Sequence, residues 1–234
     1  MKSRPILVLS TVSILASLAI AQAKTGSPAK SAAHAAAPTT QFDRNLIKNG
    51  NAETEGPDEK HVPDWPVLEG FTGVKYGSVS GEWDWGLSGC ASCGKRYLHL
   101  AFEGSTHELS VSQAVDVSAS AQDIDKADVA SSLSAYLGAF LNSDSTSIVQ
   151  ASFLDSSGKE LAKIETQPYS TKDLPKAERG STGLVECKTS GQVPAGTRKI
   201  VITWKATATG DSGDYLALGD NLSLVLTKPK DPQQ

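Results

Sequence analysis

The chain has 234 residues, of which 39% are hydrophobic and 21% are charged, and its formal net charge at pH 7 is −4. The basic residues are scattered, without a stripe or cluster, so the composition argues against a nucleic-acid-binding role. The length suits one domain of moderate size, which we expect to be a monomer.

The first 23 residues have the pattern of a secretory signal peptide. Lys2 and Arg4 make a positively charged start, residues 6–20 are mostly apolar, and Ala21-Gln22-Ala23 is a cleavage site of the A-x-A type. The apolar run is too short and wrongly flanked for a stable membrane span, and no second run of spanning length follows it. The sequence therefore predicts a protein that is exported from the cytoplasm, either secreted or periplasmic.

Residues 24–41 precede the region that we expect to be ordered. They are mainly Ala, Ser, Thr, Pro and Lys, a composition that buries too little to offset the entropy of ordering, so we expect a flexible linker. The domain itself is expected over residues 42–227, and residues 228–234 are expected to form a disordered tail.

Alternation of apolar and polar side chains with a period of two predicts short strands along the domain. The predicted strands lie over residues 97–102, 109–117, 133–141, 147–154, 160–166, 199–205 and 222–226. Gly158 supplies the positive φ of a hairpin turn over residues 155–159, and the one plausible helix, residues 120–128, is short. We expect Trp65 and Trp204 in the core. Strands at this spacing predict an antiparallel sandwich, because a doubly wound α/β sheet would need long amphipathic helices.

The three cysteines are Cys90, Cys93 and Cys187. Export permits a disulfide, and an odd number leaves one thiol unpaired. The first two have the C-x-x-C spacing, but they lie in a Gly/Ser loop without the following helix that lowers the thiol pKa in a redox-active pair. We therefore predict a small loop-closing disulfide between Cys90 and Cys93. A bond between Cys187 and one of the loop cysteines is the alternative.

Two segments at the ends of the domain carry a family resemblance. Asn45-Leu46-Ile47-Lys48-Asn49-Gly50-Asn51-Ala52-Glu53 opens the domain, and Gly219-Asp220-Asn221-Leu222-Ser223-Leu224-Val225-Leu226 closes it. With weaker fragments at 111–117, 133–138, 153–158 and 191–198, they resemble the galactose-binding-like jelly-roll domains, of the carbohydrate-binding-module type, of secreted bacterial proteins. The resemblance implies an all-β antiparallel β-sandwich of jelly-roll type, with the first and last strands side by side.

The resemblance also implies a structural calcium ion between those two strands. Glu53 and Asp220 would supply carboxylates, and carbonyls near Asn51 and from the loop over residues 89–94 would complete the oxygen shell that Ca²⁺ prefers. The alternative is that Glu53 and Asp220 are ordinary polar groups of a turn and an edge. No segment of the sequence matches the D-x-[DN]-x-[DN]-G calcium loop.

A pair of tryptophans is the clearest candidate ligand site. In an extended segment Trp83 and Trp85 lie on one side, where sugar rings could stack on the indole faces. The neighbouring Glu82 and Asp84 could accept hydrogen bonds from sugar hydroxyls, and Tyr76 is a further candidate. The alternative is that these two tryptophans close one end of the core.

Nothing in the sequence indicates a catalytic site. It has no H-x-H or H-E-x-x-H zinc motif and no phosphate-binding Gly-rich loop, and residues 77–81 resemble a nucleophile elbow only superficially. We therefore predict a non-catalytic module, not an enzyme, that binds a carbohydrate on a cell surface or an extracellular polymer. A structural or adhesive envelope or matrix protein with a protein partner is the alternative. A glycan hydrolase or lyase on the same scaffold is a third possibility, because fold does not settle function.

Overall fold

A computed structural model describes residues 41–77, 90, 92–102, 108–139, 145–170, 183–208 and 215–229. All of them belong to one compact unit, Pro38–Gln234. The predicted signal peptide, the predicted linker up to residue 40 and the predicted tail from residue 230 onwards lie outside the described residues.

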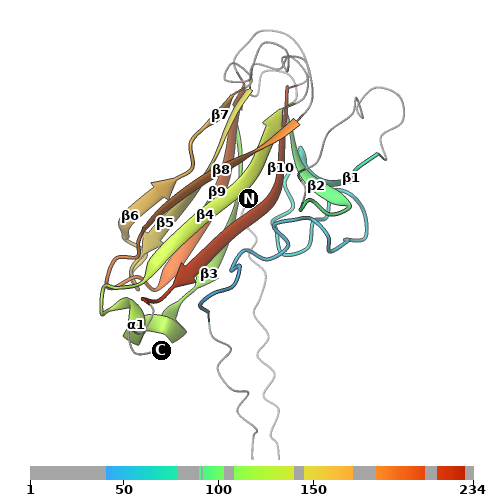
Figure 1. Cartoon of the computed structure of the whole chain (residues 1–234). Coiled ribbons are helices and arrows are strands. Elements are labelled where there is room, and N and C mark those ends of the chain that lie inside the picture. The colour runs from blue at the N-terminus through green and yellow to red at the C-terminus, as the bar shows by residue number, and fades with distance from the viewer. Residues whose placement is uncertain are drawn as a thin grey trace, which may run out of the picture. The chain divides into compact units, whose positions relative to one another are not determined.

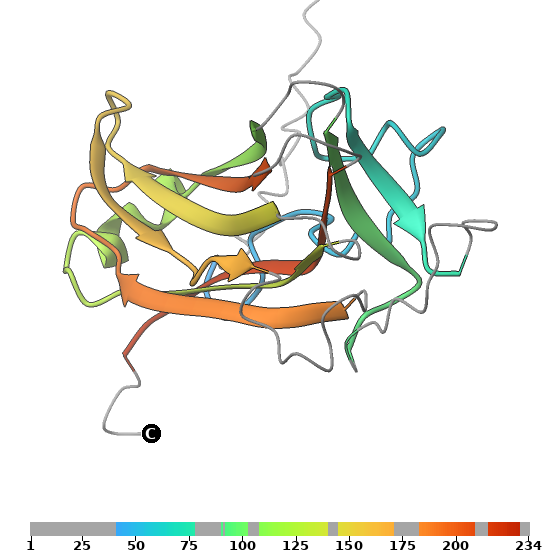
Figure 2. The ribbon, with the colours of Figure 1, turned by 90° about the horizontal axis from the view of Figure 1, so that it is seen from above.

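Two antiparallel sheets form the two layers of the domain (Figure 1). The first has the strand order β1-β2-β10-β4-β8, formed by Phe71–Lys75, Arg96–Phe102, Tyr215–Thr227, Ala130–Ala139 and Gly183–Gln192. The second has the order β3-β9-β5-β6, formed by Glu108–Asp116, Lys199–Ala208, Ser145–Leu154 and Glu160–Glu165, and the short β7, Tyr169–Ser170, pairs with β5. Seen from above, β1 and β2 run at a steep angle to β8 (Figure 2). The predicted all-β antiparallel sandwich of jelly-roll type is confirmed.

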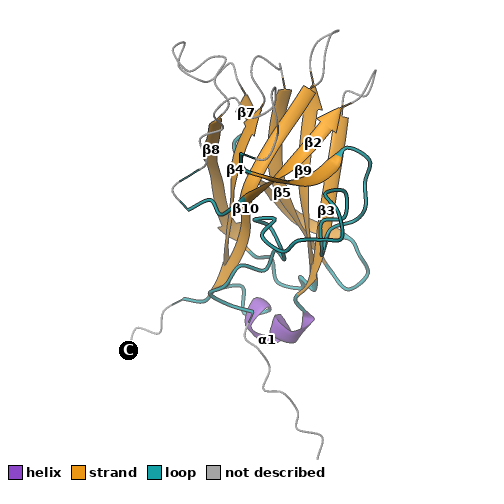
Figure 3. Ribbon diagram, turned by 90° about the vertical axis from the view of Figure 1, so that its right-hand side faces the viewer, coloured by secondary structure: helices purple, strands orange, loops and turns teal. Residues whose placement is uncertain are grey.

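The predicted helix is a single short stretch at one end of the sandwich (Figure 3). A 3₁₀ turn, η1 (Ser118–Ser120), leads into α1 (Ala121–Ile124), and the side chain of Ile124 is fully buried. In the described part of the chain, no helix has the length and apolar character needed to cross a membrane.

Aromatic side chains fill the space between the sheets near β1. Trp204 on β9 is fully buried, and its ring meets Phe71 edge-on with 6.5 Å between centroids. Trp65 packs against the same Phe71 at 5.8 Å. A Cβ atom at Gly219 would lie 3.1 Å from the Trp204 ring, so a larger residue on β10 would press against this indole. Both tryptophans are core residues, as predicted.

The opening segment lies beside the closing strand, as the family resemblance implies, but it is not a regular strand. Isolated bridges join residues 42–45 to β10. The Asn45 side chain adds two hydrogen bonds to β10: its amide donates to the carbonyl of Leu222, and its oxygen accepts from the N–H of Leu224. Positive φ values at Asn49 and Ala52 then interrupt the extended conformation.

Candidate functional site

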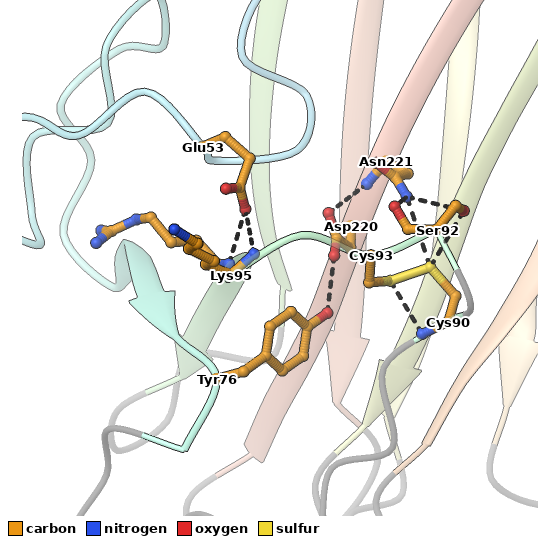
Figure 4. The surroundings of a disulfide bond; sticks show 9 residues. Glu53, Tyr76, Cys90, Ser92, Cys93, Lys95, Asp220 and Asn221 are labelled. Atoms are coloured by element: carbon orange, nitrogen blue, oxygen red, sulfur yellow. Dashed lines mark hydrogen bonds between the residues drawn. A yellow bond between two sulfur atoms is a disulfide. The ribbon is translucent and has the colours of Figure 1, made fainter.

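Four segments meet around Asp220 on β10 (Figure 4). We call this group the Asp220 corner, and it comprises Glu53, Tyr76, Cys90, Ser92, Cys93, Asp220 and Asn221. The strand is irregular here, because the register with β4 shifts between Asp220 and Ser223 and Asn221 has a φ of 49°. Bulges of this kind redirect side chains and often lie next to functional sites.

Asp220 is a fully buried carboxylate held by two hydrogen bonds. Its Oδ2 accepts from the Tyr76 hydroxyl at 2.7 Å, and its Oδ1 accepts from the backbone N–H of Asn221 at 2.6 Å. Burial raises the pKa of Asp220 to about 6, and the negative charge of Glu53 acts in the same direction, whereas the two hydrogen bonds act against it. Among the described residues, no lysine or arginine offsets the charge of the ionised group.

Tyr76 follows β1 and places an aromatic ring in the corner. Its ring centroid lies 4.9 Å from that of Tyr97, and the side chain is half-buried. Burial, and then the hydrogen bond to Asp220, raise the pKa of Tyr76, so its hydroxyl remains a donor throughout the physiological range. The two tyrosines belong to a small apolar cluster outside the main core, with Val74, Leu184 and Leu218. The corner therefore combines an aromatic surface with a hydroxyl and a carboxylate.

The predicted disulfide between Cys90 and Cys93 is present. Cys187 is unpaired and buried, so the alternative bond to Cys187 is not formed. The side-chain amide of Asn221 connects the disulfide loop to β10, donating to the Ser92 carbonyl at 3.1 Å and to Cys90 Sγ at 3.5 Å. The disulfide thus holds its loop against the same bulge that carries Asp220.

Glu53 fastens the opening segment to the start of β2. Its Oε1 accepts from the backbone N–H groups of Lys95 and Arg96, at 2.7 and 2.8 Å. A Cβ at Gly94 would overlap with that oxygen, so glycine allows this approach. Asn51 comes two residues before Glu53, and its Oδ1 accepts from the N–H of Glu53 at 3.4 Å.

The carboxylate oxygens of the Asp220 corner are suitable ligands for a hard cation. Glu53 and Asp220 are brought close enough for the charge of one to raise the pKa of the other, and carboxylate oxygens are the ligands that Ca²⁺ prefers. A cation between them would balance the buried charge of Asp220, which the described side chains leave uncompensated. The residues therefore fit a calcium ion, although both carboxylates also have hydrogen-bond donors of their own.

The predicted ligand residues divide into two groups. Trp83, Trp85, Glu82 and Asp84 lie outside the described residues, whereas Tyr76 lies in the Asp220 corner. The partner of Tyr76 in that corner, Tyr97, was not among the predicted site residues. In β2, Leu98 and Leu100 point into the core, so the alternation of side chains places Tyr97 on the opposite face. This alternation is the sequence pattern that could have identified Tyr97 as a site residue.

A groove of about 490 Å³ lies elsewhere, beside the edge strand β3. Its lining contains Arg44, Lys48, Asp64 and Asp116 and has no aromatic side chain. Gln113, one of the lining residues, accepts from the backbone N–H of Lys48 and donates to the carbonyls of Lys48 and Asp64, so its polar atoms are already satisfied. The groove lacks the stacking surface that the Asp220 corner offers.

Two histidines, His61 and His99, lie among the described residues. Burial lowers the pKa of His99 to about 4, so it is neutral at ordinary pH, and its Nδ1 lies 3.1 Å from the Thr72 hydroxyl. His61 is exposed and pairs with Asp58 at 2.6 Å. His107 lies outside the described residues.

No family model and no curated protein matches the chain. Solved structures do match. The carbohydrate-binding module TmCBM61, solved with β-1,4-galactotriose, is 17% identical, with a TM-score of 0.43 over 80% of this chain and 99% of that one. A cyclase from Fischerella sp. TAU, solved with 4-(1H-indol-3-yl)butan-2-one, is 14% identical, with a TM-score of 0.50 over 80% and 99%. The active domain of a bacteriophage CBA120 tailspike is 12% identical, with a TM-score of 0.45, and this chain spans 21% of it.

These likenesses concern the fold. The matched structures include both carbohydrate-binding modules and a cyclase, at identities of 14% to 17%. The function therefore has to be argued from the residues of this chain.

Proposed function

We propose that the protein is a secreted, non-catalytic module that binds a carbohydrate at the Asp220 corner and the adjoining segment with Trp83 and Trp85. The observation that carries the proposal is where the flanks of that segment lie. Tyr76 and Cys90, on either side of residues 78–89, both belong to the Asp220 corner. The connection that contains the two tryptophans therefore begins after Tyr76 and ends before Cys90, and both of these residues lie beside the Asp220 carboxylate.

This combination suits a sugar. The C–H face of a pyranose packs on aromatic rings, and its hydroxyls need a few well-placed polar partners. Tyr76 offers ring surface, and its phenolic oxygen keeps acceptor capacity while its proton is donated to Asp220. Glu82 and Asp84 add acceptors next to the indoles. Because these acidic groups and the net charge of −4 repel anions, we expect a neutral glycan rather than an acidic one.

The described surface gives less support to a protein partner. The exposed large apolar residues are Val67, Leu161 and Val185, and they lie on a loop, β6 and β8 rather than in one patch. The edge strand β8 carries Glu186 and Lys188, charged residues that oppose pairing with another chain.

Calcium has a structural part in this proposal. Glu53 and Asp220 hold the ion, with oxygens near Asn51, and thereby join the opening segment to β10, while the sugar contacts the ring of Tyr76 and the segment with Trp83 and Trp85 rather than the ion. The uncompensated burial of Asp220 supports this assignment. Removing calcium with a chelator should lower the melting temperature of the full-length protein, and Asp220→Asn or Glu53→Gln should remove that response. The matched control Asp58→Asn changes an exposed carboxylate and should keep it. A wild-type melting curve that chelator leaves unchanged would contradict the calcium assignment.

A screen of immobilised glycans and insoluble polysaccharides, in the presence of calcium, tests the proposed function. The full-length protein should bind one class of neutral glycan saturably. The double variant Trp83→Ala, Trp85→Ala should lose this binding while keeping its melting temperature. Leu161→Ala, which alters an exposed apolar residue of the other sheet, should bind as wild type does. Failure of the wild type to bind any glycan would contradict the proposal.

A further inference from the structure

We propose that reduction of the Cys90–Cys93 disulfide turns the Asp220 corner into a site for a thiophilic divalent cation, Zn²⁺ or Cd²⁺, bound by both thiolates and the Asp220 carboxylate. The sulfur atoms of Cys90 and Cys93 and a carboxylate oxygen of Asp220 all lie within 4.8 Å of one another. Among the described residues, no other three side chains with metal-binding atoms gather in this way. The site goes beyond carbohydrate binding and does not depend on it.

The spacing of the cysteines matches the chemistry of the ion. A C-x₂-C pair is a common half of a tetrahedral zinc site, and soft thiolates select Zn²⁺ or Cd²⁺ over hard cations. Two sulfur atoms that occupy tetrahedral positions around zinc, with Zn–S bonds of about 2.3 Å, lie about 3.8 Å apart. After reduction, the two cysteine sulfur atoms therefore need to move apart by only a short distance. The Cα atoms of the two cysteines are already 4.9 Å apart and need no large movement of the loop.

The surroundings of the sulfurs favour the thiolate form. The backbone N–H of Cys90 donates to Cys93 Sγ at 3.0 Å, and the side-chain amide of Asn221 donates to Cys90 Sγ at 3.5 Å (Figure 4). Each sulfur thus has an N–H donor, and such donors stabilise negative charge on a metal-bound sulfur.

Asp220 is placed to complete the set. The Tyr76 hydroxyl orients its carboxylate from one side and the Asn221 N–H from the other, which is the kind of second layer that fixes metal ligands. Three protein ligands leave the fourth tetrahedral position for water. Calcium, a hard cation, gains nothing from thiolates, so the reduced site prefers zinc or cadmium to the ion that we assign to the oxidised protein.

The chemical step balances with a dithiol or a phosphine as reductant. A dithiol gives up two electrons and two protons and becomes a disulfide, while the Cys90–Cys93 bond breaks and two thiols form. Binding of the cation then releases both thiol protons. The two cysteines are partly exposed and accessible to the reductant, whereas Cys187 is buried in β8 and takes no part.

Cadmium titration of the full-length protein tests the proposal. The protein is reduced with a water-soluble phosphine, which becomes a phosphine oxide with oxygen from water, and is kept free of air. Titration should develop the thiolate-to-cadmium charge-transfer band to a limit of one ion per chain. The oxidised protein should show no band, and Cys187→Ser should titrate as wild type does. A band in the oxidised protein, or one lost in Cys187→Ser, would overturn the proposal.

The role of Asp220 needs a test of its own. Asp220→Asn should weaken cadmium binding about tenfold or more, because a neutral amide replaces a charged ligand. Equal binding by the folded variant would show a site of two thiolates alone and would overturn the proposal. Should the variant not fold, infrared difference spectra of the reduced wild-type protein with and without cadmium decide the same point. A shift of carboxylate stretching bands on binding is expected, and thiolate binding of cadmium with no change in these bands would contradict the site.

Discussion

Replacing Asp220 by asparagine should change how the stability of the protein depends on pH. In the folded protein the pKa of Asp220 is raised from 3.8 to about 6. Between these pH values the folded state holds a proton that the unfolded state has released. The stabilisation from the protonated carboxyl is therefore fully present below about pH 4 and is lost as the pH rises through 6.

The size of the effect follows from the change in pKa. Each pKa unit corresponds to about 1.4 kcal/mol, so the rise from 3.8 to about 6 amounts to about 3 kcal/mol. Because the adjacent Tyr76 is only half-buried, solvent screening reduces the expected effect to about 2 kcal/mol. Asparagine has nearly the same shape, can still accept a hydrogen bond from Tyr76, and does not titrate. The difference between the two proteins therefore isolates Asp220 from the other carboxylates.

Urea unfolding between about pH 4 and about pH 7.5, with chelator present, is the assay. Relative to wild type, Asp220→Asn should gain about 2 kcal/mol in free energy of unfolding as the pH rises from 4 to 7. A difference that stays constant across this range would refute the reasoning. With calcium instead of chelator, the ionised carboxylate is favoured and the wild type should be the more stable protein at neutral pH.

Three further variants or measurements test other parts of the structure. Asn45→Ala removes three side-chain hydrogen bonds, two of them to β10, and should cost about 2 kcal/mol in urea unfolding; Asn45→Asp keeps the acceptor bonds and should cost less, and equal losses would contradict this. Gly94→Ala should lower stability by about 2 kcal/mol, because the new Cβ displaces the Glu53 carboxylate from two N–H groups; an unchanged melting temperature would count against that contact. The denatured, unreduced protein should show one reactive thiol, and three would disprove the disulfide.

The strands that could be predicted are those that bury every second residue. In β9, Ile200, Ile202 and Trp204 are all fully buried while their neighbours are partly exposed, so the alternation is visible in the sequence. The edge strand β8 was not predicted because only Cys187 among its ten residues is buried. The five-residue β1 was missed as well, since it is short and contains Gly73.

The candidate site could be predicted only in part, because it depends on pairing between distant strands. The loop disulfide followed from local composition and spacing. The bond between Tyr76 and Asp220 joins residues 144 positions apart, and it exists because β2 lies between β1 and β10 in the sheet. No local pattern fixes that order. The bonds from Glu53 to the start of β2 likewise depend on the path of an opening segment that is not a strand.

The most direct test of the central proposal is the affinity for whichever glycan the screen retains, measured by calorimetry at fixed calcium concentration. The double variant Trp83→Ala, Trp85→Ala should bind about a hundredfold more weakly than wild type, because two aromatic contacts are lost. Tyr76→Phe, which keeps the ring against Tyr97 and removes the hydroxyl, should bind with a smaller loss. Unchanged affinity in the folded double variant would place the ligand elsewhere and contradict the proposed site.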